Sequence, residues 1–196
     1  MHLSRITLGR SQAVTMRMSD SYAWHQALWK AFPRRDDEAR DFLFRIDDVG
    51  RDFQVMLLSA SEPELPVWGH WELKRVAPSF LDYQTYAFQL RANPTMRRSK
   101  DRRRLAIYQE QRLVDWLQRK AGNHGFEVSG DSLVVGAPMD ESFIRGNQRG
   151  KHVSVDFHGM LKVTNRSLFQ ETFQKGIGSA KAFGFGMLML QPVSSS

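Results

Sequence analysis

The sequence of 196 residues contains no cysteine. This absence excludes a disulfide framework, a thiolate zinc site, an iron–sulfur cluster and a cysteine nucleophile. No apolar run approaches the roughly 18 residues that a membrane-spanning helix requires, and the first residues, Met1 to Arg5, lack the apolar stretch of a secretory signal. We therefore expect a soluble, cytoplasmic protein.

Glycine and proline are not unusually frequent, with 14 and 7 residues, and the chain has no low-complexity tract. Hydrophobic residues make up 41% and aromatic residues 11%. This composition is typical of a folded globular protein and excludes wholesale disorder. At about 150 residues per domain, the length fits one large domain or two small ones, and either can bury a core.

Positive charge is concentrated in the second half of the chain. Residues 1–94 contain 12 basic and 12 acidic side chains, whereas residues 95–196 contain 16 and 9, so the whole net charge of +7 lies there. Such an excess is typical of proteins that bind a polyanion, above all nucleic acid, although a solvated surface loop is the simpler alternative. The densest run holds six cations interrupted only by Asp101, namely Arg97, Arg98, Lys100, Arg102, Arg103 and Arg104.

Hydrophobic periodicity predicts the elements of the first half. Alternation indicates strands, and a 3.6-residue period after a capping residue indicates a helix. The stretch that contains Pro63, Pro66 and Pro78 gives no firm prediction. The expected elements are a strand at 2–8, a helix at 19–32 capped by Ser19 or Asp20, a hairpin of strands 41–46 and 52–59, and a strand at 85–91 that ends at Pro94.

The second half repeats this order of elements. We expect a helix at 108–120, extended segments at 132–138 and 152–164, a helix at 167–175 and a strand at 186–191. The repeat predicts an α+β fold of two tandem ferredoxin-like, or RRM-like, domains at residues 1–94 and 95–196. Because RRMs share this architecture, the fold and the charge both favour RNA, but an analogy of fold does not establish function.

Tyr22, His25 and Trp29 form a stripe along the first predicted helix, at spacings of three and four residues. The stripe lies at the margin of the face that Ala27 and Ala31 would bury. A histidine titrates near neutral pH, and a neighbouring phenol can orient it, so the pair Tyr22 and His25 suits proton transfer. The alternative is an ordinary half-exposed histidine beside a packing tyrosine.

A glycine-rich segment at 176–186 follows a predicted helix and precedes a predicted strand. This context fits neither a Walker loop nor a dinucleotide-binding loop. Glycine removes side-chain obstruction, so the segment can bring backbone N–H groups to a phosphate diester, while a tight structural turn is the alternative. The candidate phosphate-binding residues are Gly176, Gly178, Lys181, Gly184 and Gly186.

The remaining histidines form no recognisable metal motif. His152, Ser154, Asp156 and His158 share one face of a predicted strand, which could form a metal or acid–base cluster, but we favour the polar face of a half-buried strand. The acidic group at 36–38 is flanked by arginines. We therefore interpret it as a surface on which the acidic and basic charges neutralise each other, rather than as a magnesium site. We therefore predict no metal and no cofactor.

Six segments taken together resemble the CasE-type endoribonucleases, which process guide RNA in the type I-E CRISPR surveillance complex Cascade. The resemblance runs along the whole chain, from residue 1 to about residue 192, in the order of the family. The matching segments are 25–29 with Phe32-Pro33, Arg40–Arg45, Arg91–Pro94, Trp116–Lys120, Val155–Gly159 and the glycine-rich segment Gly176–Gly186.

The resemblance implies metal-independent cleavage of the CRISPR repeat RNA at the base of its hairpin, with other Cascade subunits as partners. It places a general acid–base at His25 and an assisting tyrosine at Tyr22, and RNA contacts at the glycine-rich segment and at Arg102 to Arg104. The chain departs from the family in that Asp101 interrupts the basic run and Ala106 stands where proline is usual.

Cleavage of this kind needs no metal, because RNA carries its own nucleophile in the 2′-hydroxyl group. We expect a 2′,3′-cyclic phosphate and a 5′-hydroxyl as product ends. We also expect the basic loop between the two extended segments to reach a groove of the RNA stem through Arg145, Arg149 and Lys151.

The competing hypothesis is a non-catalytic, RRM-like RNA-binding or scaffold protein. The sequence lacks the aromatic RNP pattern of such readers. A basic DNA-binding protein is less favoured, since no helix-turn-helix or zinc finger is recognisable.

Overall fold

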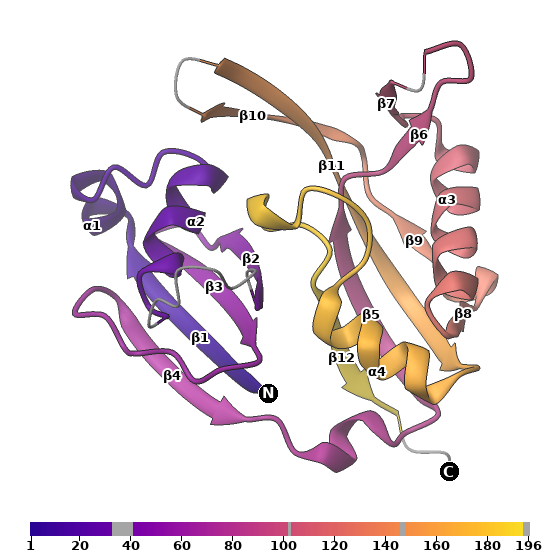
Figure 1. Cartoon of the computed structure of the whole chain (residues 1–196), viewed down its shortest axis with the longest axis horizontal. Helices are drawn as coiled ribbons and strands as arrows, with labels where there is room; N and C mark the ends of the chain where they lie inside the picture. Colours follow the sequence, from indigo (N-terminus) through magenta and orange to yellow (C-terminus); the bar gives the residue numbers. More distant parts are fainter. Residues whose placement is uncertain (33–40, 102, 146–147, 194–196) are drawn as a thin grey trace.

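The first large antiparallel sheet is built from the N-terminal part of the chain (Figure 1). In the computed structural model, the described residues are 1–32, 41–101, 103–145 and 148–193. The sheet has the strand order β2-β3-β1-β4, and α1 (Arg10–Thr15) and α2 (Ser21–Trp29) follow its first strand. Its strands are β1 (His2–Gly9), β2 (Phe42–Asp48), β3 (Asp52–Ser59) and β4 (His70–Arg75).

The second sheet has the main order β10-β11-β5-β12, with β8 and β9 also paired to β11. Its strands are β5 (Thr85–Ala92), β8 (Phe126–Val128), β9 (Val134–Val135), β10 (Met139–Arg145), β11 (Gln148–Val163) and β12 (Leu188–Pro192). The remaining elements are α3 (Glu110–Asn123), α4 (Arg166–Lys175), the hairpin of β6 (Thr95–Arg97) and β7 (Arg104–Ala106), and the 3-10 helices η1 (Pro78–Leu81), η2 (Gly130–Ser132) and η3 (Lys181–Phe183).

Both sheets place the third strand of their unit between the second and the first, with the fourth beside the first. This is the strand order of a ferredoxin-like sheet, and the expected α+β fold with two such units is confirmed. The expected domain boundary at residue 94 does not coincide with the change of sheet. β5 pairs with β11 and β12 of the second sheet, so it opens the second unit, and β4 completes the first. Alternation along residues 85–91 identifies a strand but does not identify its partner.

The helix that carries the candidate catalytic stripe begins where the sequence indicates. The side chain of Asp20 accepts hydrogen bonds from the backbone N–H groups of Tyr22 and Ala23 at 3.0 and 2.9 Å, so Asp20 is the N-cap of α2. The regular helix ends at Trp29, three residues before the predicted end at Phe32. The helix α1, only six residues long, was not predicted.

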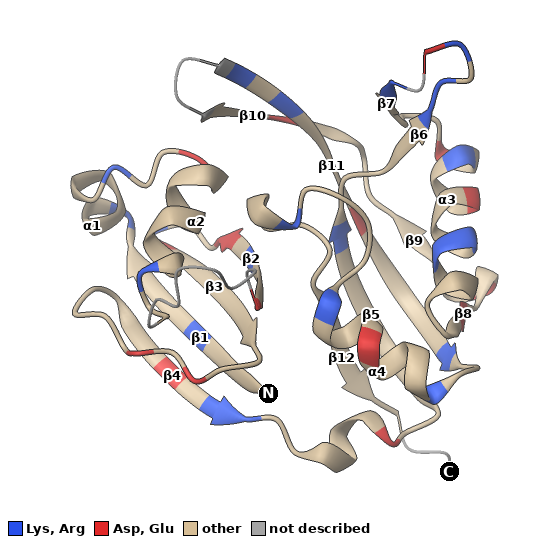
Figure 2. Ribbon diagram, viewed as in Figure 1, with Lys and Arg blue, Asp and Glu red and all other residues tan. Residues whose placement is uncertain are grey.

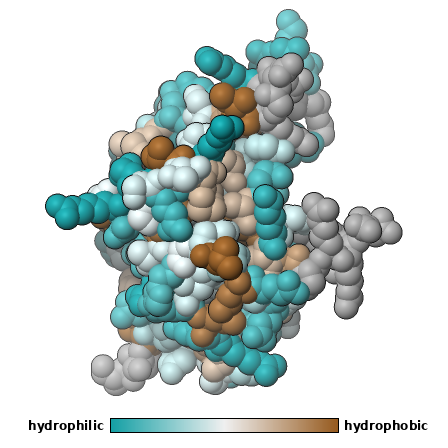
Figure 3. Space-filling view, turned by 90° about the vertical axis from the view of Figure 1, so that its left-hand side faces the viewer, coloured by the Kyte–Doolittle hydropathy of each residue, from teal (hydrophilic) through white to brown (hydrophobic). Residues whose placement is uncertain are grey.

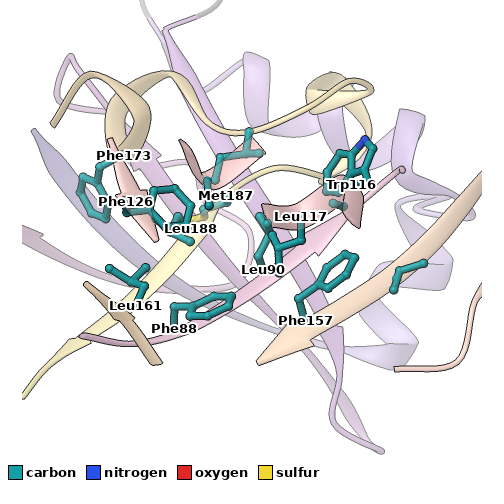
Figure 4. Packing of buried hydrophobic residues seen from close by; sticks show 14 of the residues in the cluster. Phe88, Leu90, Trp116, Leu117, Phe126, Phe157, Leu161, Phe173, Met187 and Leu188 are labelled. Atoms are coloured by element: carbon teal, nitrogen blue, oxygen red, sulfur yellow. The ribbon is translucent and has the colours of Figure 1, made fainter. Parts of the chain in front are cut away.

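Each sheet has its own hydrophobic cluster. In the first, Trp24 and Leu28 of α2 pack against apolar residues of β1 and β3. In the second, Trp116 and Leu117 of α3 are buried against the sheet, together with Phe157 of β11 (Figure 4). On the face of the molecule drawn in Figure 3, hydrophobic atoms form small groups among hydrophilic ones, which is ordinary for a folded protein.

Four charged side chains join the two sheets. Arg91 of β5 donates to Asp156 of β11 and to Asp47 of β2, in each case at 3.0 Å from Nη2. Its Nη1 also donates to the carbonyl oxygen of Ile46 at 2.6 Å. Arg45, only 7% exposed, pairs with Asp47 at 2.9 Å and lies 3.4 Å from Asp156. Burial by itself lowers the pKa of Arg91, but the hydrogen bond to Asp156 and the charges of Asp156, Asp47 and Glu141 together raise it above its usual value.

Replacing Arg91 with methionine should destabilise the protein by at least about 2 kcal/mol, because the partly buried carboxylates of Asp47 and Asp156 lose their hydrogen bonds to Arg91 and, among the described residues, keep only the charge of Arg45 beside them. The matched control is Arg5→Met, which removes an exposed ion pair to Glu72 and should cost about 1 kcal/mol or less. Urea unfolding of both variants measures the difference. Equal losses would show that the cluster between the sheets contributes no more than a surface ion pair.

Candidate functional site

Tyr22 and His25 lie side by side on α2, as the helical spacing predicts. Their ring centroids are 6.5 Å apart and the rings are inclined by 26°. Trp29 continues the stripe at 5.7 Å from His25, and Phe42 and Phe44 of β2 lie beneath the imidazole at 5.8 and 6.2 Å. Both imidazole nitrogens of His25 have almost no exposed surface.

The glycine-rich segment of the second unit reaches this site. Phe183 of η3 lies 6.2 Å from the ring of Tyr22, measured between centroids. Gly184 lies so close to Phe44 that a Cβ atom there would stand 3.3 Å from the ring. In Figure 1, the gold segment that contains η3 lies between α2 and the hairpin of β10 and β11. The fold thus brings together two features that are about 150 residues apart in the sequence.

The glycines of this segment serve first as turn residues. All four candidates have positive φ, from 72° at Gly176 to 86° at Gly186, a region that glycine tolerates best. Gly176, Gly184 and Gly186 are buried, and the N–H of Gly186 donates to the carbonyl oxygen of Arg91 at 2.8 Å. These three positions fit the tight-turn alternative. The contacts of all four glycines with phosphate remain a prediction.

The predicted basic run forms an exposed hairpin at β6 and β7. Arg97 and Arg104 stand directly opposite each other across the two strands. Arg98 pairs with Asp101, and Arg103 lies 3.5 Å from the same carboxylate. Lys100 is exposed, and Arg102 lies outside the described residues. Since like charges directly opposite each other repel, the pair of Arg97 and Arg104 favours binding of an anion.

A groove of about 250 Å³ connects this hairpin to the glycine-rich segment. Arg119 and Lys120 of α3 add two cations to it that the sequence analysis did not select. One sequence signal could have identified Arg119 and Lys120 as candidates. They lie close to the inward-facing Trp116 and Leu117, in the segment Trp116–Lys120 that carries the family resemblance. Burial lowers the pKa of Lys120, and the charges of Arg119 and Arg104 lower it further. The groove is lined by Asn93, Thr95, Met96, Arg97, Arg104, Trp116, Arg119, Lys120, Gly178 and Ser179.

Lys181 does not line this groove. Its Nζ donates to the carbonyl oxygen of Lys175 at 2.7 Å, which ties the segment to the end of α4. A contact of Lys181 with phosphate stays a prediction.

The second predicted basic element is the hairpin of β10 and β11 (Figure 2). Arg145 is the last residue of β10, and Arg149 and Lys151 lie near the start of β11. Arg149 is exposed, and Lys151 forms an ion pair with Asp140 at 2.6 Å, which raises the pKa of the lysine. The hairpin is also tied to α2, the helix that carries Tyr22 and His25. The backbone N–H of Ile144 donates to the second carboxylate oxygen of the N-cap Asp20 at 3.0 Å.

The polar face of β11 does not form a cluster for catalysis. Asp156 belongs to the ion pairs between the sheets, and Ser154 is buried. His152 lies among aromatic rings, and its burial lowers its pKa. In the part of the chain that the structure describes, no group of three or more His, Asp or Glu side chains could hold a metal ion. None of the described helices is both long and apolar enough to cross a membrane.

Comparison with known proteins identifies the family. Residues 1–192 match the family model described as CRISPR associated protein. The CRISPR system Cascade subunit CasE of Escherichia coli is 31% identical over 98% of this chain and its own full length. The CRISPR-associated endoribonuclease Cse3 of Thermus thermophilus is 28% identical over 98% of this chain and its own full length.

Solved structures agree with these relatives. A structure of CRISPR endoribonuclease Cse3 bound to a 19-nucleotide RNA has a TM-score of 0.86 at 25% identity and covers 98% of this chain and all of its own. The crystal structure of the CRISPR-associated protein Cas6e from Escherichia coli has a TM-score of 0.77 at 28% identity, with 98% and 100% coverage. In fold, in length and in the order of its motifs, the chain belongs to the CasE-type family of CRISPR-associated proteins.

Proposed function

We propose that this protein is an endoribonuclease that cleaves CRISPR precursor RNA within the repeat hairpin. The observation that carries the proposal is the pair of Tyr22 and His25 at the junction of the two units, next to the glycine-rich segment. The relatives named Cse3 support this activity, since Cse3 is called an endoribonuclease and a solved structure of Cse3 has RNA bound.

The reaction needs three contributions from the protein. The 2′-hydroxyl group of the nucleotide upstream of the cut attacks the adjacent phosphorus, its proton passes to the imidazole of His25, and the bond from phosphorus to the 5′-oxygen breaks. The imidazolium gives a proton to the leaving 5′-oxygen, so we assign His25 as general acid–base, with Tyr22 orienting the imidazole. A nearby cation stabilises the developing charge. General acid–base catalysis typically contributes about 10²–10⁴-fold, and alignment of the reacting groups adds several kcal/mol.

Two basic surfaces are available for the RNA. The groove with Arg97, Arg104, Arg119 and Lys120 offers cations for backbone phosphates, and Gly178 leaves room for a close approach. The hairpin of β10 and β11 projects beyond the sheet and can follow the stem of an A-form helix through its backbone. Because these contacts survive the cut, the protein keeps the guide RNA and delivers it to the other Cascade subunits. It should therefore behave nearly as a single-turnover enzyme in the cytoplasm.

A labelled repeat hairpin, incubated with the protein in excess EDTA, tests the activity. The expected result is one cut at the base of the hairpin, at the same rate with and without the chelator. Tight binding of the hairpin without any cut would favour the non-catalytic RNA-binding alternative, and loss of cleavage in EDTA would contradict the metal-independent mechanism.

A further inference from the structure

Phe183 stands at the meeting point of the two units. It ends η3, which lies between two residues in the left-handed conformation, Ala180 with φ of 60° and Gly184 with φ of 83°. Its half-buried ring lies 6.2 Å from Tyr22 on one side and 4.3 Å from Phe143 of β10 on the other, measured between centroids. One side chain therefore contacts both the catalytic helix and the basic hairpin.

The second unit holds this ring from several directions. Phe143 lies directly opposite Gly150 in the hairpin register, and a Cβ atom on Gly150 would stand 2.1 Å from its ring. Phe143 thus occupies space that only a glycine leaves open. It also stacks on His152 at 4.6 Å with an angle of 16°, and His152 meets Phe183 edge-on at 4.6 Å.

His152 is itself fixed by Asn93. The amide nitrogen Nδ2 of Asn93 lies 3.1 Å from Nδ1 of His152, and its oxygen Oδ1 accepts from the backbone N–H of Val153 at 3.3 Å. The cluster of Phe143, His152 and Phe183 is therefore anchored to β11 and to Asn93, which directly follows β5, and this restrains the ring of Phe183.

We infer that Phe183 is a positioning residue for Tyr22 and His25, and that Phe143 of the basic hairpin holds it in that position. This inference rests on the proposed function. It links the surface that we assign to RNA binding with the pair that we assign to proton transfer, through the contacts from Phe143 to Phe183, from Phe183 to Tyr22 and from Tyr22 to His25.

The expected consequence concerns the rate of cleavage rather than binding. Phe183 and His25 both pack near the ring of Tyr22, so removal of Phe183 gives the phenol more freedom to move. Displacement of a catalytic group by about 1 Å can lower a rate by roughly 10²-fold. RNA affinity depends mainly on the basic surfaces, which this change leaves in place.

The test is the single-turnover cleavage rate of Phe183→Ala at saturating protein, together with its affinity for the repeat hairpin. We expect the rate to fall by about 10–100-fold and the affinity to stay within a few-fold. Phe183→Leu keeps an apolar side chain against Tyr22 and should recover most of the rate. The matched control is Phe80→Ala, since Phe80 is also half-buried in a 3-10 helix but packs against Tyr86 and Phe173, away from the site.

A double-mutant cycle separates positioning from a general structural effect. If Phe183 acts through Tyr22, then Phe183→Ala should cost much less in a Tyr22→Ala background than in the wild type. Equal losses in both backgrounds would overturn the inference. Gly150→Ala supplies an independent variant that leaves Phe183 intact, and it should lower the rate by displacing Phe143.

The inference and the proposed function can fail separately. If Phe183→Ala cleaves at the wild-type rate while His25→Ala is inactive, the positioning role is refuted and the function stands. If His25→Ala also cleaves at the wild-type rate, the assignment of the catalytic pair itself is refuted.

Discussion

The variant His25→Ala should lose cleavage of the repeat hairpin while its affinity for that hairpin stays within a few-fold of the wild type. Proton transfer by a positioned imidazole acts on the transition state, so its removal should lower the single-turnover rate by about 10²–10⁴-fold. We expect the ground-state affinity to come from cations on the basic groove and on the hairpin of β10 and β11, which the substitution does not touch.

Tyr22→Phe is the matched comparison for this variant. It removes only the hydroxyl group and keeps the ring between His25 and Phe183, so a milder loss is expected. A larger loss in Tyr22→Phe than in His25→Ala would reverse the two roles. Wild-type cleavage by His25→Ala would remove the imidazole from the mechanism.

A repeat hairpin with 2′-deoxyribose at the nucleotide just upstream of the cut should bind normally and remain intact. The substitution deletes the nucleophile and leaves the phosphates in place, so it acts on the reaction rather than on the binding that those phosphates provide. The matched control carries 2′-deoxyribose one nucleotide further upstream and should be cleaved. Quantification of the intact and cut RNA over several wild-type half-lives measures both. Cleavage of the first substrate would point to attack by water in place of the 2′-hydroxyl group.

Local sequence patterns predicted those parts of the site that lie on a single element. A helix with a known start places residues three apart on one side, so the pairing of Tyr22 with His25 follows from the sequence alone. The sequence also restricted the N-cap to Ser19 or Asp20, and the structure shows that it is Asp20. The tandem order of strands and helices likewise indicated two ferredoxin-like units. A family resemblance added the expectation of RNA cleavage, which periodicity alone does not contain.

The parts that were missed depend on contacts between distant segments. The alternation at 85–91 indicates a strand, but it does not indicate that this strand pairs with β11 and β12 of the second sheet. Arg119 and Lys120 become part of the basic groove only because α3 packs beside the hairpin of β6 and β7. Phe183 gains its contact with Tyr22 only where the second unit meets the first. A short-range sequence pattern carries no information about such contacts between distant segments.

The chemical identity of the two new ends is the most direct test of the central claim that the RNA supplies its own nucleophile and the protein supplies His25. Mass spectrometry of the products from one hairpin cut in EDTA distinguishes the possible ends. The account predicts a 2′,3′-cyclic phosphate on the upstream fragment and a 5′-hydroxyl on the downstream fragment. A 3′-hydroxyl paired with a 5′-phosphate would contradict it.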